Sequence, residues 1–365
     1  MNKWKKVLAI ATAAVMTGSL LTGCGGGSKA PAADTKAPAA DTTAAAGSEA
    51  EAPKEEAKAD SGETYEIVIG HIVDENNTWH KASLKFKEIV EDKSGGRIKV
   101  TIYPNNQLGS EVEMIQSILT NGGCDITYTG ESMQTYAEEL GIIGMPYAIT
   151  SDDHMDAVLN GEVGQELEDL MLQSGMRCLG YFTRGPRNVT SNKEIKTPDD
   201  LKGFIIRTPQ SPMTVAAFEA MGAKPTPMAF GEVFTSLQQG VIDGQENPLA
   251  MIKTGAFSEV QKYVVRTEHL RAWVYIAMGE EKFQSLPEDL QQVVLDAGKE
   301  MQTYEHELFL AEETELENEL KDAGMTFVDV DQKLFAEKAI AGVLPILTEK
   351  QSALYDKIKA LEPQS

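Results

Sequence analysis

The sequence predicts an α/β protein of two domains, with long helices near the C-terminus that cross both of them. The chain has 365 residues and 42% apolar content, enough for two ordinary domain cores. Strand and helix patterns alternate along most of the chain, which is typical of parallel-rich sheets covered by helices. Two long helical patterns follow at 287–323 and 332–361.

The first 23 residues have the pattern of a secretory signal peptide. Three lysines precede an apolar run at 7–21, which is too short to span a bilayer as a transmembrane helix. The tetrapeptide Leu-Thr-Gly-Cys that ends at Cys24 resembles a bacterial lipobox. We therefore expect cleavage before Cys24 and a lipid on its thiol; the alternative is an ordinary signal peptide followed by an incidental cysteine.

Residues 24–62 contain alanine, proline, glycine and acidic residues, with almost no large apolar side chain. Such a segment cannot form a core, and we expect a disordered tether behind the lipidated cysteine. Together these features predict an extracytoplasmic protein that is anchored to the cell membrane as a lipoprotein.

Folded sequence begins near residue 63. Residues 65–70 alternate as a strand, and 79–91 carry apolar residues at helical spacing before a glycine stop. A strand at 97–102, a helix at 110–119 and a strand at 124–128 complete a β-α-β-α-β order. We expect a first domain at 63–186, to which part of the C-terminal region returns.

A second unit of the same kind begins near residue 177. Its predicted elements are strands at 178–182, 188–191, 204–207 and 273–278, and a helix from the Ser-Pro cap at 211 to residue 221. We expect a second domain at 187–280, and long helices at 281–365 that pack across both domains.

Charge and motifs exclude several functions. With 56 acidic against 33 basic residues, the chain should be repelled by nucleic acid, and any site for an acid must carry its own cations. The five histidines lack metal-ligand spacing, and the sequence has neither a nucleophile elbow nor a phosphate-binding loop. We expect no metal, no cofactor and no enzymatic activity.

The two cysteines beyond Cys24 lie beside predicted strands. Export would allow Cys124 and Cys178 to form a disulfide if their Cα atoms lie within about 7 Å. The sequence leaves that pairing open, and we interpret both as small buried apolar residues.

Two arginines and an asparagine are candidates for binding a carboxylate. Arg207 ends a strand just before Pro209, where a guanidinium could hold a carboxylate through two parallel hydrogen bonds. Arg187 is a second cation at the start of a strand. Asn247 precedes Pro248 in a segment rich in turn formers. The alternatives are surface ion pairs for the arginines and a plain turn at 243–248.

These segments resemble the DctP-like extracytoplasmic solute receptors of tripartite ATP-independent periplasmic (TRAP) transporters, over about residues 65–361. The matching motifs are Gly-Arg-Ile-Lys-Val at 96–100, Asn-Gln-Leu-Gly at 106–109, Asp-Asp-Leu-Lys-Gly at 199–203, Arg-Thr-Pro at 207–209, Lys-Pro-Thr-Pro-Met-Ala-Phe at 224–230 and Val-Ile-Asp-Gly-Gln-Glu-Asn-Pro at 241–248.

The resemblance implies a periplasmic-binding-protein-like (Venus-flytrap) fold that closes over its ligand by hinge motion. It also implies that TRAP membrane subunits are the partners. It assigns the carboxylate clamp to Arg207, with Arg187 as a second arginine and Asn247 as the ligand-binding asparagine. The other candidate ligand contacts are Phe230, Glu131, Asn77 and His80, together with His269 as a residue that can reach the ligand through water.

The ligand expected from this pattern is an organic acid. Gln134 stands where a sialic-acid-binding member would have an arginine, and Glu131 would repel a second carboxylate. We therefore favour a sugar acid such as a uronate over a C4-dicarboxylate. Two alternatives remain open: a ligand-sensing ectodomain that serves a membrane kinase or chemoreceptor, and a secreted hydrolase or lyase of sugar acids.

Overall fold

The structure is a computed structural model that describes residues 63–363. The predicted signal peptide, the lipidated Cys24 and the tether at 24–62 lie outside the described residues. Among the described helices, none is both long enough and apolar enough to cross a membrane.

The first sheet has five strands in the order β2-β1-β3-β10-β4. β1 (Tyr65–Gly70) is parallel to β2 (Ile98–Tyr103) and to β3 (Ile126–Thr129). The predicted β-α-β-α-β order is therefore confirmed. β10 (Val274–Gly279) inserts antiparallel between β3 and β4 (Met176–Phe182).

Helices connect the parallel strands of this sheet. α1 (Thr78–Lys93) starts at Asn77, whose side chain accepts a hydrogen bond from the Trp79 amide. α2 (Glu111–Leu119) starts at a capping box formed by Ser110 and Glu113. Three further helices adjoin this sheet: α3 (Asp152–Leu159), α4 (Glu162–Gln173) and α8 (Glu280–Gln284).

The second sheet has six strands in the order β11-β9-β5-β8-β6-β7. β5 is antiparallel to both β8 and β9, whereas β6 is parallel to β7 and β8. The strands are β5 (Arg187–Ser191), β6 (Ile205–Thr208), β7 (Lys224–Pro227), β8 (Gly244–Asn247), β9 (Tyr263–Leu270) and β11 (Thr326–Val328). The helices beside it are α5 (Pro212–Ala220), α6 (Val233–Gln238) and α7 (Leu249–Thr254).

The structure corrects two expectations and excludes one alternative. β4 and β10 belong to the first sheet, so the second unit begins after β4, and the range 187–280 includes a strand of the first sheet. Residues 244–247 form the buried strand β8, which excludes the alternative of a plain turn at 243–248. The helical pattern at 332–361 is interrupted: α10 (Gln332–Val343) ends before Pro345, which cannot continue the helix, and α11 (Glu349–Ala360) starts at a new cap on Thr348.

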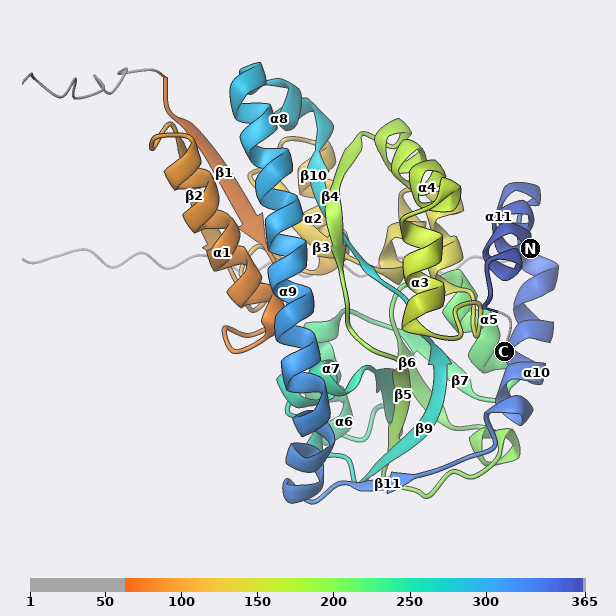
Figure 1. The fold of residues 1–365 in the computed structure, drawn as a ribbon. Coiled ribbons are helices and arrows are strands. Elements are labelled where there is room, and N and C mark those ends of the chain that lie inside the picture. Colours follow the sequence, from red (N-terminus) through yellow and green to blue (C-terminus); the bar gives the residue numbers. More distant parts are fainter. Residues whose placement is uncertain (1–62, 364–365) are drawn as a thin grey trace, which may run out of the picture. The chain divides into compact units, whose positions relative to one another are not determined.

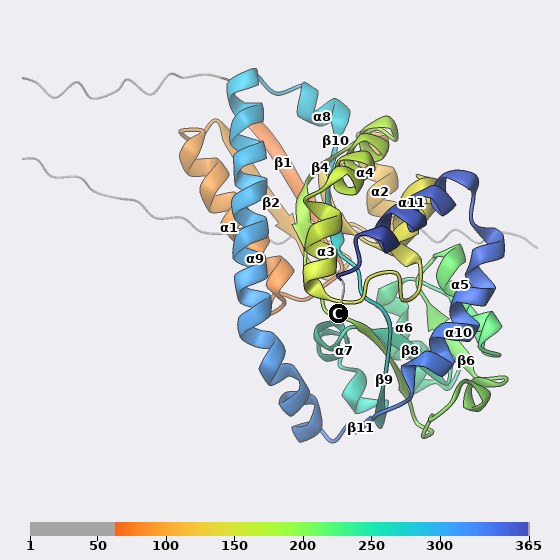
Figure 2. The ribbon, with the colours of Figure 1, turned by 45° about the vertical axis from the view of Figure 1, so that its right-hand side comes forward.

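The predicted long helices do span both sheets. α9 (Glu288–Asp322) has 35 residues, a length of about 52 Å. It packs on α1 and β4 beside the first sheet and on α7 beside the second, as Figure 1 shows. In the turned view of Figure 2, α10 lies along α5 and α11 returns to the first sheet, where it packs on α4. The chain also crosses between the sheets at 183–186 and 271–273.

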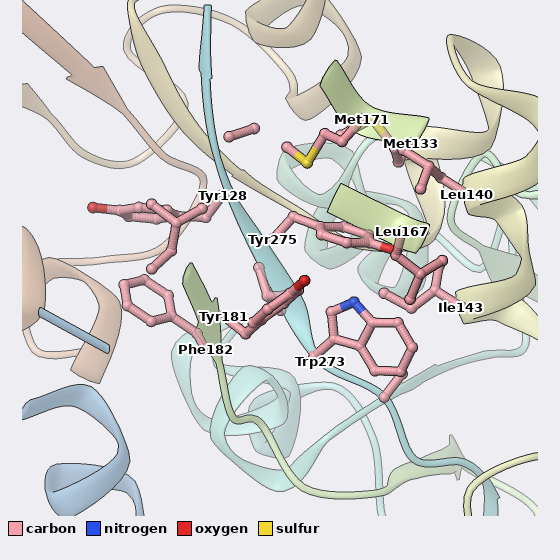
Figure 3. Packing of buried hydrophobic residues seen from close by; sticks show 14 of the residues in the cluster. Tyr128, Met133, Leu140, Ile143, Leu167, Met171, Tyr181, Phe182, Trp273 and Tyr275 are labelled. Atoms are coloured by element: carbon pink, nitrogen blue, oxygen red, sulfur yellow. The ribbon is translucent and has the colours of Figure 1, made fainter. Parts of the chain in front are cut away.

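Aromatic side chains fill the core where these crossings leave the first sheet (Figure 3). The ring centroids of Tyr128 and Phe182 lie 4.7 Å apart, and those of Tyr181 and Tyr275 lie 5.8 Å apart. Trp273 packs edge-on against Tyr275. Each such pair contributes roughly 0.5–1.5 kcal/mol beyond its buried area. The crossing segments therefore start from firmly packed strand ends.

The two cysteines of the described chain are both free thiols. Cys124 is buried and Cys178 is half-buried. Burial raises the pKa of each thiol to about 12, which keeps the thiol protonated and unreactive. This agrees with their interpretation as small apolar residues.

Candidate ligand-binding site

A small cavity lies between the two sheets and is lined from both of them. Its volume is about 30 Å³, far below the ~300–1,000 Å³ of typical ligand pockets. A ligand larger than a few atoms can therefore enter only if the surrounding elements move apart. The lining includes two glutamates and three arginines: Glu111, Glu131, Arg184, Arg187 and Arg207.

Arg207 is the buried cation of this cavity that has no carboxylate partner among residues 63–363. β6 ends one residue later, before Pro209, so the side chain projects from a strand end. Its Nε and Nη2 donate to the carbonyl oxygen of Met228 at 3.0 and 2.8 Å. Burial lowers the pKa of Arg207 to about 10, although the nearby Glu246 carboxylate opposes the shift. The guanidinium is still charged at neutral pH and is available to an anion.

Arg187 has its charge matched within the protein. Its Nε lies 2.5 Å from Glu246 Oε2, and its Nη2 donates to Glu246 Oε1 at 2.8 Å. Burial alone would raise the pKa of Glu246, but Arg187 outweighs burial and holds that pKa at about 2. Burial would lower the pKa of Arg187, but Glu246 and Glu131 together raise it. The predicted second cation thus lines the cavity as half of a buried ion pair.

His269 extends this ion pair and does not line the cavity. Its Nε2 lies 3.0 Å from Glu246 Oε2, and its Nδ1 lies 2.9 Å from the Thr267 hydroxyl. The ring therefore orients Glu246, which in turn orients Arg187. Direct contact between His269 and a ligand is not part of this arrangement.

Glu131 lines the cavity and is paired with an arginine that sequence reasoning missed. Arg184 Nη1 donates to Glu131 Oε2 at 3.2 Å, and Arg184 Nη2 donates to Glu131 Oε1. Arg187 Nη1 is 3.8 Å from Glu131 Oε2. Burial would raise the pKa of Glu131, but these two guanidinium groups lower it. Arg184 had one weak signal in the sequence, its position in Arg-Gly-Pro-Arg three residues before Arg187.

Glu111 is a second residue of the site that sequence reasoning missed. It accepts hydrogen bonds from the Thr129 hydroxyl at 2.6 Å and from the Gly130 amide at 3.0 Å. Burial raises the pKa of Glu111, which favours its neutral form. Its sequence position in the first turn of a helix is ordinary for an acid and gave no hint of burial. Glu111 holds the turn that carries Glu131.

Asn247 and Phe230, two of the predicted ligand contacts, both line the cavity. Asn247 ends β8, and its Nδ2 donates to Gln245 Oε1 at 2.6 Å, which leaves its own Oδ1 available to a donor. Phe230 packs edge-on against Phe257 at 5.8 Å. Trp79 and Tyr128 add aromatic surface from the first sheet's side.

Asn77 and His80 lie outside the lining of the cavity. Asn77 caps α1, and its Nδ2 donates to the Thr254 hydroxyl at 3.0 Å. His80 Nδ1 lies 3.1 Å from His71 Nε2, and burial lowers the pKa of both rings, that of His71 to about 3. These side chains hold helix α1 in place and do not face the site.

Comparison with known proteins identifies the family to which this chain is related. Residues 69–347 match the model of bacterial extracellular solute-binding proteins, family 7. A solute-binding protein of Roseobacter denitrificans is 44% identical over 283 residues, which cover 77% of this chain and 87% of that protein. The 2,3-diketo-L-gulonate-binding periplasmic protein YiaO of Escherichia coli is 30% identical over 271 residues, covering 73% and 82%.

Solved structures agree with these relatives. The TRAP periplasmic solute-binding protein of R. denitrificans with bound L-galactonate matches with a TM-score of 0.79 and 42% identity, covering 82% of this chain and 99% of that chain. A TRAP periplasmic solute-binding protein of a Sulfitobacter species with bound β-D-galacturonate matches with a TM-score of 0.78 and 27% identity, covering 81% and 99%.

The chain therefore belongs to family 7 of the bacterial extracellular solute-binding proteins. This confirms the family resemblance, the two-domain periplasmic-binding fold and an extracytoplasmic location. The relatives are solute-binding proteins and not enzymes.

Proposed function

We propose that this protein is the solute-binding component of a TRAP transporter and that it captures a sugar acid through one carboxylate. The observation that carries the proposal is Arg207, a buried guanidinium with no carboxylate partner within the described part of the chain. The other two arginines of the cavity are matched by glutamates. A guanidinium in this position can hold a carboxylate through two parallel hydrogen bonds.

The rest of the lining suits a hydroxylated ligand. Glu131 and Asn247 offer acceptor oxygens to hydroxyl groups, and Trp79, Tyr128 and Phe230 offer apolar faces to carbon. L-galactonate, β-D-galacturonate and 2,3-diketo-L-gulonate, which the relatives bind, are all sugar acids with one carboxylate. We favour this class over C4-dicarboxylates.

A thermal-shift panel of aldonates, uronates and C4-dicarboxylates with the purified protein tests the proposal. At about 100 times the dissociation constant, a bound acid adds about 2.7 kcal/mol of stability and raises the melting temperature by several degrees. Arg207→Met should abolish the shift. Arg271→Met, which removes a surface pair with Asp152, should keep it. Equal shifts in both variants would rule out Arg207 as the clamp.

The membrane subunits of a TRAP transporter are the proposed recipients of the ligand, and Cys24 is the proposed point of attachment to the membrane. Cys24→Ser should move the exported protein from the membrane fraction to the soluble fraction. Cys178→Ala, which removes a thiol from the folded part, should leave it with the membrane. Retention of the Cys24→Ser protein on the membrane would contradict the lipid anchor.

A further inference from the structure

We propose that Glu131 makes the site selective for sugar acids with one carboxylate, because it occupies Arg184 and so withholds a second cation from the ligand. The inference rests on the proposed function and deepens it: the substrate class narrows to aldonates and uronates, and aldarates, their dicarboxylic counterparts, are excluded. Glu131 and Arg184 act as specificity-determining residues.

The ion pair between Arg184 and Glu131 is built into the wall of the cavity. The side chain of Arg184 is 5% exposed and that of Glu131 is 4% exposed. Both oxygens of Glu131 are engaged by Arg184, and both residues line the cavity. Surface ion pairs are weak because water screens them, whereas breaking a buried pair leaves an uncompensated buried charge and is strongly unfavourable.

Of the three arginines in the cavity wall, two are paired with glutamates and one has no carboxylate partner among residues 63–363. Arg187 is matched by Glu246, and Arg184 is matched by Glu131. Arg207 donates hydrogen bonds to the carbonyl oxygen of Met228 and has no carboxylate partner in the part of the chain that the structure describes. The remaining acid, Glu111, is held by the Thr129 hydroxyl and the Gly130 amide. One ligand carboxylate can therefore pair with Arg207.

A second ligand carboxylate would be buried beside Glu131 without a counter-ion. Burying an uncompensated charge is strongly unfavourable, and the negative Glu131 adds repulsion. If the charge of Glu131 were removed, Arg184 would become a second unmatched cation and could accept that carboxylate.

Contacts outside the ion pair keep Arg184 at the cavity. Its Nε donates to the carbonyl oxygen of Ala272 at 3.3 Å. Its guanidinium lies against Gly130, where an added Cβ would approach Nη1 to 3.0 Å. Gly130 is itself held by Glu111. The guanidinium therefore stays in place when its acidic partner becomes neutral.

The test compares L-galactonate with galactarate, which has the same carbon chain and a second carboxylate in place of the terminal hydroxymethyl group. Isothermal titration of the wild-type protein should show a preference for galactonate of about 100-fold or more. Glu131→Gln should bind galactarate at least tenfold more tightly than the wild type does and should lose most of the preference.

A double variant distinguishes an effect of charge on selectivity from damage to the fold, because restored selectivity requires a folded protein. Glu131→Gln with Arg184→Gln again leaves one unmatched cation, so its preference should return to galactonate. Arg184→Gln alone leaves Glu131 with only the more distant guanidinium of Arg187, 3.8 Å away, and the affinity of this variant for both acids should fall at least tenfold. A folded Glu131→Gln protein that still excludes galactarate would overturn the proposal. So would a double variant that prefers galactarate.

Glu280→Gln is the matched control, because Glu280 forms a bidentate pair with Arg177 away from the cavity. It should leave the ratio of the two affinities unchanged. Failure of the wild type to bind any sugar acid would refute the proposed function itself. Binding of galactonate and galactarate with equal affinity by the wild type would refute only this inference.

Discussion

Glu305 lies on α9 and joins three parts of the chain through one buried carboxyl group. It accepts hydrogen bonds from the Thr78 hydroxyl at 2.8 Å and from the Thr183 amide at 3.0 Å. Thr78 starts α1, and Thr183 begins the first crossing between the sheets. Burial raises the pKa of Glu305 to about 8. The carboxyl group is thus mainly protonated at neutral pH.

This raised pKa predicts a loss of stability in mild alkali. The folded protein holds the proton up to about pH 8, whereas the unfolded chain releases it near pH 4.3. The free energy of unfolding should therefore fall by about 2 kcal/mol between pH 6.5 and 8.5. Glu305→Gln should remove this decline, because its Oε1 can accept from the Thr183 amide while its uncharged Nε2 donates to the Thr78 hydroxyl.

Denaturant unfolding across that pH range measures the effect, and Glu307→Gln on the exposed face of α9 is the control. The range also avoids the titration of His71, whose lowered pKa makes stability rise with pH only below about 6.5. A Glu305→Gln protein with the same decline as the wild type would exclude Glu305 as its source.

For individual residues, the sequence predicts some of the buried charges of the site but not which of them pair with one another. Arg207 could be predicted because its strand and the following proline are local features. The pairing of Arg187 with Glu246 joins residues 59 positions apart, so the same sequence allows either a free or a matched arginine. Arg184 was missed for the same reason.

At the scale of the element, β8 supplies Glu246 and Asn247 and lies between β5 and β6. Its four residues, Gly-Gln-Glu-Asn, lack the apolar alternation that identifies a strand. They are buried because neighbouring strands satisfy their polar groups; Gln245, for example, donates to the Thr190 hydroxyl at 3.0 Å. These hydrogen bonds come from residues distant in the sequence, which is why the sequence alone left a plain turn open as an alternative. The strands at 65–70 and 98–103 were predictable because their apolar residues alternate.

Gly244 allows β8 to fit between its neighbours. A Cβ at this position would overlap the carbonyl oxygen of Thr190 and come within 2.6 Å of the Phe204 ring. We expect Gly244→Ala to cost about 1–3 kcal/mol of stability, measured by denaturant unfolding, and to weaken ligand binding. Gly231→Ala, which meets only the flexible end of Asn106, should cost less. Equal stability of the two variants would contradict this packing.

Helix α1 and helix α7 are joined by the bond from Asn77 to Thr254. Helix α1 connects two strands of the first sheet, and α7 follows β8 of the second sheet. This bond should therefore stabilise the arrangement in which the two domains are closed over the ligand. Thr254→Val should leave the α1 cap intact, weaken ligand binding severalfold and lower stability by less than about 1 kcal/mol. Asn77→Ala should also lose the cap, at a further cost of about 1 kcal/mol.

Titration of both variants and of the double variant measures this coupling. If the bond acts in closure, the two losses of affinity should not add, because either change removes it. Additive losses would show that Asn77 and Thr254 affect binding independently.

At the scale of the whole molecule, the small cavity and the charged side chains from both sheets predict hinge closure around the ligand. Small-angle scattering should show a smaller radius of gyration when L-galactonate is added to the wild type. The Arg207→Met variant should show no change at the same concentration. A radius that is independent of ligand in the wild type would contradict closure.

The two-domain α/β class was predictable from alternating local patterns, whereas the return of β10 to the first sheet was not. The strand lies far along the chain from β3 and β4, and its apolar residues suit either sheet. Its place is set by packing such as that between Tyr181 and Tyr275, which only the folded structure provides.

The most direct test of the central claim is calorimetric titration of the wild-type protein with L-galactonate and with galactitol, the neutral polyol of the same carbon chain. If the unmatched Arg207 holds one ligand carboxylate, galactonate should bind at micromolar concentration or below, and galactitol at least about 100-fold more weakly. Equal affinity for the two compounds would show that the carboxylate is not what the site recognises.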